Sequence, residues 1–127
     1  MRLFNILLSL AQKVGAMKDY VVEEGTSGIW QYRKWNSGLM EAWTPDRNTF
    51  TVTPVEILGG YYGATSISVP SGFKSRPVGF ASGYLGTGIG FAITTRSTST
   101  QVNVGILSNA NNTTMTIESL YIYGKWK

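Results

Sequence analysis

Seven acidic residues are the first candidates for chemistry in this sequence: Asp19, Glu23, Glu24, Glu41, Asp46, Glu56 and Glu118. A glycoside hydrolase needs two carboxyl groups that face each other across one sugar. Glu41 and Glu56 could converge in a folded chain, but nothing in their spacing requires it. Structural pairing with Arg33, Lys34 or Arg47 explains the acidic residues better. We therefore expect no catalytic residues and no enzyme.

The sequence also contains no pattern typical of a metal site or a cofactor site. The chain contains no cysteine and no histidine, which removes thiolate ligands, the commonest metal ligand and the commonest general base. Asp19, Glu23 and Glu24 lack the loop signature of a calcium site. The glycines between positions 83 and 90 do not fit the dinucleotide-binding spacing, because the next residue is Phe91. We expect no metal and no cofactor.

Exposed aromatic side chains are the remaining candidates for a binding site. The rings of tyrosine and tryptophan stack on the C–H faces of sugars, while neighbouring polar groups hold the hydroxyls. Tyr61 and Tyr62 lie between glycines and Trp43 lies near a turn, so these three are the candidates for glycan binding. For the tryptophans, an anchoring role in the core or a subunit interface is favoured. We assign Trp30 and Trp35 to the interface between subunits.

These aromatics are positioned by residues 25–43, a segment that predicts a β-hairpin. Its first run, residues 29–35, is rich in aromatics, and its second run, residues 39–43, follows a turn-forming Asn-Ser-Gly. Alternate side chains of a strand share a face. Large aromatics therefore fall on both faces of the first run, with Trp30 on one and Trp35 on the other. This pattern predicts packing on two sides, against the chain's own core and against another copy.

The sequence DYVVEEGTSGIWQYRKWNSGLMEAW, residues 19–43, resembles a segment of the C-terminal regions of tail and baseplate proteins of phages and prophages of Gram-positive bacteria. The ending IESLYIYGKWK, residues 117–127, is similar to the aromatic final strand of the same domains. The middle of the chain resembles the family only in its strand character, rich in Gly, Ser and Thr. The resemblance implies a homotrimeric, β-structured virion component, some relatives of which contact host surface glycans. It implies no catalytic residues.

The rest of the chain predicts an antiparallel β-sandwich or jelly-roll-like domain. Short alternating runs are separated by turns of Gly, Asn and Pro, at residues 50–58, 64–69, 76–84, 89–93, 101–107 and 113–123. One of these runs places three apolar residues on a shared face: Val102, Val104 and Ile106. In the last run we expect four residues to share a face: Met115, Ile117, Tyr121 and Tyr123.

The composition indicates one domain of low charge. The 127 residues suffice for one core and are too few for two ordinary domains. Charged residues make up 14%, against about a quarter on average, as expected when much of the surface is buried between subunits. The net charge of +4 is spread along the chain rather than gathered in a basic stripe, so we expect no nucleic-acid partner. No segment has the length of a membrane-spanning helix, so we expect no membrane insertion.

Residues 1–18 predict an amphipathic helix. Apolar residues recur at alternating steps of four and three, as in the seam of a coiled coil: Leu3, Leu7, Leu10, Val14 and Met17. We expect three such helices to bundle about a three-fold axis, which makes residues 1–18 an oligomerisation helix and residues 19–127 the β domain. A secretory signal peptide is less favoured, because Asn5 and Ser9 interrupt the apolar run. The other alternative is a helix packed on its own domain.

These patterns together predict a non-enzymatic, homotrimeric tail or baseplate module. It would be assembled in the bacterial cytoplasm and belong to the virion. Its partners would be other tail or baseplate proteins and host cell-wall or surface glycans. The alternative is a stand-alone carbohydrate-binding module that uses exposed aromatics. A glycan hydrolase ranks last, because the sequence offers no credible acid and base pair.

Overall fold

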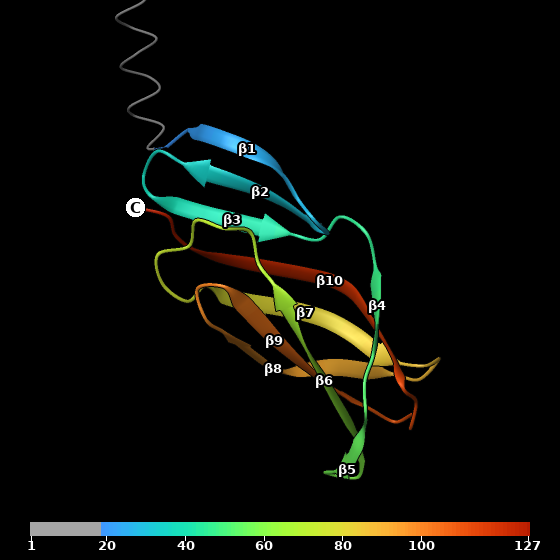
Figure 1. Cartoon of the computed structure of the whole chain (residues 1–127). Helices are drawn as coiled ribbons and strands as arrows, with labels where there is room; N and C mark the ends of the chain where they lie inside the picture. Colours follow the sequence, from blue (N-terminus) through green and yellow to red (C-terminus); the bar gives the residue numbers. More distant parts are fainter. Residues whose placement is uncertain (1–18) are drawn as a thin grey trace, which may run out of the picture.

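The computed structural model describes residues 19–127 as two antiparallel sheets (Figure 1). Sheet A contains β1 (Val21–Ser27), β2 (Trp30–Trp35), β3 (Leu39–Trp43), β4 (Asn48–Thr51), β7 (Val78–Leu85) and β10 (Thr114–Lys125). Sheet B contains β5 (Val55–Ile57), β6 (Gly60–Ser68), β8 (Gly90–Ser97) and β9 (Gln101–Ser108). The predicted mainly β class is confirmed for this part of the chain.

The aromatic hairpin forms where the sequence predicts it. β2 and β3 pair in antiparallel register, with Arg33 opposite Glu41. The turn between them closes through the N–H of Gly38, which donates to the carbonyl oxygen of Trp35 at 3.0 Å. Gly38 has a φ of 102°, a conformation that favours glycine. Because β1 pairs with the other edge of β2, the first three strands form a meander.

The long strand β10 connects the parts of sheet A (Figure 1). Its residues 121–125 pair with β3, and its residues 114–117 pair with β4. Along its other edge, β10 pairs with β7. A single strand near the end of the chain therefore joins three strands that come much earlier in the sequence.

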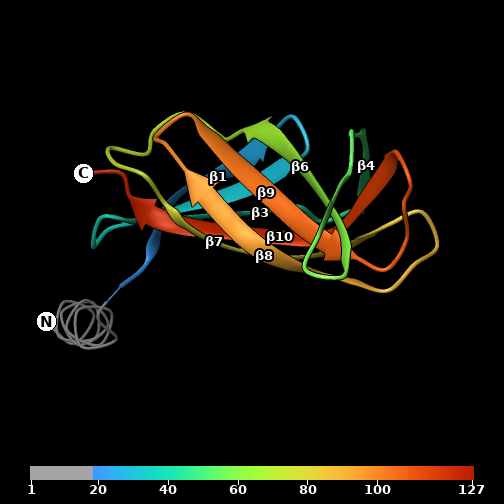
Figure 2. The same ribbon diagram turned by 90° about the horizontal axis from the view of Figure 1, so that it is seen from below.

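The two sheets share one hydrophobic core. β9 contributes Val102, Val104 and Ile106, which are fully buried, so their predicted common face is confirmed. The buried apolar side chains of β2, β3 and β10 in the same core are Trp30, Met40, Ala42, Met115, Ile117, Leu120 and Ile122. Figure 2 shows β6, β8 and β9 in front of β1, β3 and β10. The core therefore lies between the two sheets.

The predicted common face of the last strand is wrong. Met115 and Ile117 are buried, whereas Tyr121 and Tyr123 lie on the outer face of sheet A. The pairing of β10 with β7 shifts register between Ile117 and Ser119. Such a bulge adds one residue and reverses the alternation beyond it. The tyrosines are thereby turned away from the core.

The predicted helix of residues 1–18 lies outside the described residues, and so does its proposed seam: Leu3, Leu7, Leu10, Val14 and Met17. The predicted division into residues 1–18 and 19–127 stays a prediction. Over that part, no helix has the length and apolar character needed to cross a membrane.

Candidate binding face

Rows of large side chains cover the outer face of sheet A. Residues directly opposite each other in an antiparallel pair share a face. Two such rows run from β2 through β3 and β10 to β7: Gln31, Trp43, Tyr121 and Phe80, and beside them Arg33, Glu41, Tyr123 and Val78. We call these eight residues the aromatic face. Their chain neighbours Met40, Ala42 and Ile122 are fully buried, so the rows point away from the core.

Glu41 is the central acceptor of the aromatic face. Its Oε1 accepts a hydrogen bond from Nε1 of Trp35 at 3.1 Å, and its Oε2 accepts one from the hydroxyl of Tyr121 at 2.6 Å. Burial and this hydrogen bond raise the pKa of Tyr121 to about 12. Both oxygens of Glu41 are thus held by the chain itself. The carboxylate links β2, β3 and β10.

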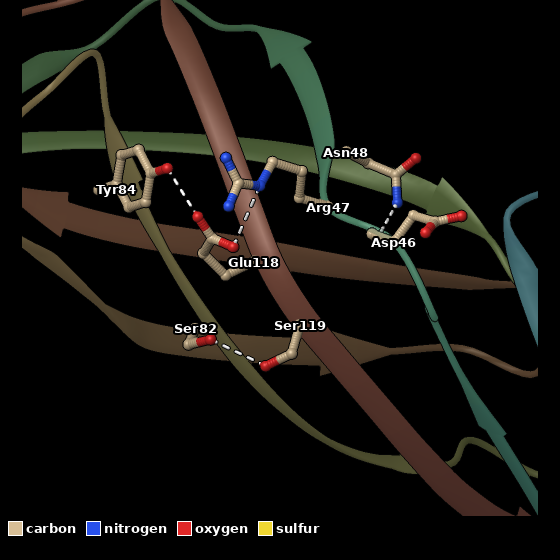
Figure 3. Close-up of polar contacts among 7 residues, drawn as sticks. All are labelled: Asp46, Arg47, Asn48, Ser82, Tyr84, Glu118 and Ser119. Atoms are coloured by element: carbon tan, nitrogen blue, oxygen red, sulfur yellow. Dashed lines mark hydrogen bonds and ion pairs between the residues drawn. The ribbon is translucent and has the colours of Figure 1, made fainter.

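A second carboxylate, Glu118, organises the first half of β10 (Figure 3). Its Oε1 accepts a hydrogen bond from the hydroxyl of Tyr84 at 2.7 Å, and its Oε2 lies 3.4 Å from Nε of Arg47. The hydrogen bond to Glu118, together with burial, raises the pKa of Tyr84. Beside this group, the hydroxyl oxygens of Ser82 and Ser119 lie 2.8 Å apart. These contacts tie β7 and β10 to the loop before β4.

Trp43 lies under the guanidinium group of Arg33, whose carbon is 5.0 Å from the centre of the indole ring. Nε of Arg33 lies 3.3 Å from Oε2 of Glu24, in an ion pair whose two side chains are exposed. Exposed pairs of this kind contribute little to stability, so Arg33 can move aside at small cost. The hollow beside them, about 310 Å³, is lined also by Thr26 and Gln31. Trp43 therefore combines an aromatic ring with hydrogen-bonding neighbours, as a glycan site requires.

The structure separates the other two glycan candidates from Trp43 and from each other. Tyr61 and Tyr62 are neighbours in β6, so their side chains point to opposite faces of sheet B. Tyr61 packs against the hydrophobic core. Tyr62 lies opposite Val55 and Leu107, on the outer side of the sheet. The three predicted residues therefore do not form one site.

The two tryptophans predicted for a subunit interface have different surroundings. Trp30 is 2% exposed, and its Nε1 donates to the carbonyl oxygen of Ser68 at 2.8 Å. It belongs to the core and has almost no surface left for a second chain. Trp35 is half-buried, and its carbonyl oxygen accepts a hydrogen bond from Nε1 of Trp126 at 2.7 Å. An interface role for Trp35 stays a prediction.

An apolar cluster on sheet B was not marked as a site by the sequence patterns. Phe91 lies opposite Leu107, and Leu58 and Ile89 occupy neighbouring turns. These four residues, which we call the apolar cluster, line a hollow of about 310 Å³. Leu58 and Ile89 are 82% and 80% exposed. The sequence signal for the cluster is Leu58 itself, a large apolar residue directly before the turn-forming glycines 59 and 60.

Three of the glutamates form ion pairs with basic side chains. The expected pairing with Arg33, Lys34 and Arg47 is confirmed, because each of these lies within 3.4 Å of a glutamate oxygen. Glu41 lies in sheet A, whereas Glu56 lies in β5 of sheet B. Within residues 19–127, no three acidic side chains gather as they would around a metal ion.

The chain matches no protein-family model, no characterised protein and no solved structure. Its function therefore has to be inferred from its own residues and contacts.

Proposed function

We propose that the chain is a non-enzymatic structural module of a phage or prophage tail or baseplate, that it works as a homotrimer, and that its surface contacts host glycans. The resemblance of residues 19–43 and 117–127 to such proteins supports the proposal. So does the pair of sheets around one core, which we class as a β-sandwich of the jelly-roll-like kind. The protein would then belong to the virion, with other tail or baseplate proteins as partners.

The observation that best supports the proposed trimer is the backbone conformation of Leu58, in the turn between β5 and β6. Leu58 has a φ of 51°, and it is the sole non-glycine residue with a positive φ within residues 19–127. This left-handed conformation costs a leucine about 1–2 kcal/mol. The side chain is also 82% exposed. The left-handed backbone and the exposure of an apolar side chain both make leucine unfavourable at this position. Contact of the side chain with another molecule would offset these two costs.

A three-fold arrangement gives this side chain a partner. In the proposed trimer, the helices predicted from the sequence of residues 1–18 would set the register of three chains, and each apolar cluster would pack against a neighbouring copy. The few charged residues of the chain fit a surface that other subunits cover. Three linked copies also multiply weak contacts, so that millimolar glycan sites together hold a cell surface.

Light scattering at micromolar concentration tests the proposal by giving the mass of the intact chain, of a variant that begins at Lys18, and of Leu58→Asn. We expect a trimer for the intact chain and weaker association for both variants. Because asparagine tolerates the left-handed conformation, Leu58→Asn should also raise the free energy of unfolding of the single domain, by about 1 kcal/mol.

Leu39→Asn is the matched control, because Leu39 is an exposed leucine on the opposite sheet. We expect this change to leave the mass unaltered. A monomeric intact chain would remove the assembly mechanism. A trimer that Leu58→Asn and Leu39→Asn weaken equally would remove the role of the apolar cluster.

The alternative function is a stand-alone carbohydrate-binding module, which the hollow beside Trp43 favours. In that case the monomer binds sugar, and the indole of Trp43 stacks on the sugar ring once Arg33 has moved aside. Trp43→Ala should then abolish saturable binding to a glycan array, while Tyr62→Ala leaves it intact. A trimer whose glycan binding survives Trp43→Ala excludes this alternative.

A further inference from the structure

A hollow of about 500 Å³ lies at the end of the domain, where the β2–β3 turn, the segment before β7 and the end of β10 meet. We call it the end hollow and define it by five of its lining residues: Leu39, Arg76, Val78, Tyr123 and Lys125. Its volume falls in the range of small-molecule sites, about 300–1,000 Å³. It combines an apolar floor with a charged rim.

The apolar floor is held in a fixed shape. The ring of Tyr123 stacks on Phe80, with the ring centres 6.3 Å apart and 17° between the planes. Leu39 and Val78 are exposed beside it. Such a surface suits the C–H face of a sugar, and a ring that is already supported loses little freedom when a ligand binds.

The charged rim consists of Arg76 and Lys125, which are both exposed. The N–H of Lys74 donates to the carbonyl oxygen of Lys125 at 2.8 Å. Phe73 and Pro77 are buried, so the segment that carries Arg76 is fixed against the end of β10. Among residues 19–127, neither Arg76 nor Lys125 takes part in an ion pair.

Two acidic side chains of the described residues lie near the end hollow, and both already have hydrogen-bond donors. Asp19 accepts hydrogen bonds from the hydroxyl of Ser37 and, at 2.9 Å, from its backbone N–H. Glu41, which lies opposite Tyr123, accepts the two hydrogen bonds described above. Since neither carboxylate forms an ion pair with Arg76 or Lys125 within residues 19–127, we take the two cations of the rim as available to an anion from outside.

The charge of the rim decides which occupant fits. Residues 1–18 join the domain beside the end hollow, at Asp19, but their charged side chains are Arg2, Lys13 and Lys18. Like charges repel, so this segment is disfavoured as the occupant. A molecule that presents an anion and an apolar C–H face matches both parts of the hollow.

We infer that the end hollow binds an anionic saccharide, a sugar that carries a carboxylate or a phosphate. The sugar ring packs on Tyr123, and the anion lies between Arg76 and Lys125. Arginine offers a planar pair of donors to a carboxylate or phosphate, and lysine adds a point charge. The inference rests on the glycan contact in the proposed function and gives that contact a ligand class.

Calorimetric titration of the intact chain at low salt tests the inference, with trigalacturonate as the carboxylate probe and glucose 6-phosphate as the phosphate probe. We expect saturable binding of at least one, and the comparison shows which anion is preferred. The methyl ester of trigalacturonate has the same rings without the charge. It should bind at least about tenfold more weakly, because it loses the charged hydrogen bonds.

Arg76→Gln and Arg96→Gln form a matched pair, because both remove an exposed arginine that is in no ion pair within the described part of the chain. We expect Arg76→Gln to lower the affinity about tenfold or more, and Arg96→Gln to change it less than about twofold. Thermal unfolding checks that both variants fold.

Equal losses in the two variants, or equal binding of the ester, would overturn the inference, since general charge attraction would then explain the binding. Failure of both probes to bind would overturn it too. Such a failure would not contradict the proposed trimer, because the mass measured by light scattering tests the trimer separately.

Discussion

The outer faces of the two sheets differ in how their side chains find partners. On sheet A the aromatic face is broad, but its central polar group has partners within the chain, because Glu41 accepts hydrogen bonds from Tyr121 and from the neighbouring Trp35. On sheet B the apolar cluster gathers around Leu58, which is exposed and left-handed. The aromatic face contains several of the aromatic residues that stand out in the sequence. The apolar cluster contains Leu58, whose left-handed backbone conformation has no evident cause within a single chain.

This difference shows that aromatic content alone does not mark a contact surface. The aromatics of sheet A support each other through stacking and shared acceptors, so substitutions there should change the stability of the domain. The apolar cluster lacks such support, and substitutions there should change association instead. Each experiment below separates these two effects.

Glu41→Ala should have the largest effect on stability. It leaves the donors of Trp35 and Tyr121 without their acceptor, which costs about 1–3 kcal/mol of the free energy of unfolding. Glu56→Ala, the same change on exposed β5, should stay within about 0.5 kcal/mol. Urea denaturation measures both. Equal effects would mean that the carboxylate does not hold the aromatic face together.

Phe80 and Phe91 allow a direct comparison of the two faces, because they are 62% and 59% exposed. Phe80→Ser removes the stacking on Tyr123 and should lower the free energy of unfolding by about 0.5–1.5 kcal/mol, with the solution mass unchanged. Phe91→Ser should weaken the trimer and leave the stability of the domain nearly unaltered. The reverse pattern, in parallel denaturation and light-scattering measurements, would exchange the roles of the two faces.

Alkaline pH should weaken the aromatic face through Tyr121. The pKa of its phenol rises from 10.0 to about 12 on folding, because of burial and the hydrogen bond to Glu41. Between these values the unfolded chain releases a proton that the folded chain retains. The stabilisation is therefore complete below pH 10 and is lost as the pH rises through 12.

Denaturation at several alkaline pH values measures this loss. Tyr121→Phe should flatten the decline, whereas Tyr20→Phe, at an exposed tyrosine whose hydroxyl has no hydrogen bond within residues 19–127, should not. An unchanged decline in Tyr121→Phe would assign the effect to other groups.

The ion pair between Arg47 and Glu118 should matter least. The side chain of Arg47 is exposed and that of Glu118 is partly exposed, so Arg47→Gln should lower the free energy of unfolding by less than about 1 kcal/mol. Added salt should reduce even that difference, because it screens exposed charges. A loss that salt does not reduce would show that Arg47 acts through packing rather than through charge.

Much of the fold could be predicted because it depends on neighbouring residues. The Asn-Ser-Gly turn, the aromatic runs around it and the alternation of Val102, Val104 and Ile106 are local patterns, and all of them appear in the structure. The candidate site was predicted less well. Tyr61 and Tyr62 share a sequence environment, but one packs on the core and the other faces outward.

The sequence by itself determined the β class and the aromatic hairpin, because turn chemistry and strand alternation act over a few residues. The tertiary structure alone decided which faces meet the core. It placed the register shift in β10 that turns Tyr121 outward, and it brought that tyrosine to Glu41, 80 residues away in the chain. It also fixed the left-handed turn at Leu58. Such choices depend on contacts between distant segments, which no local pattern records.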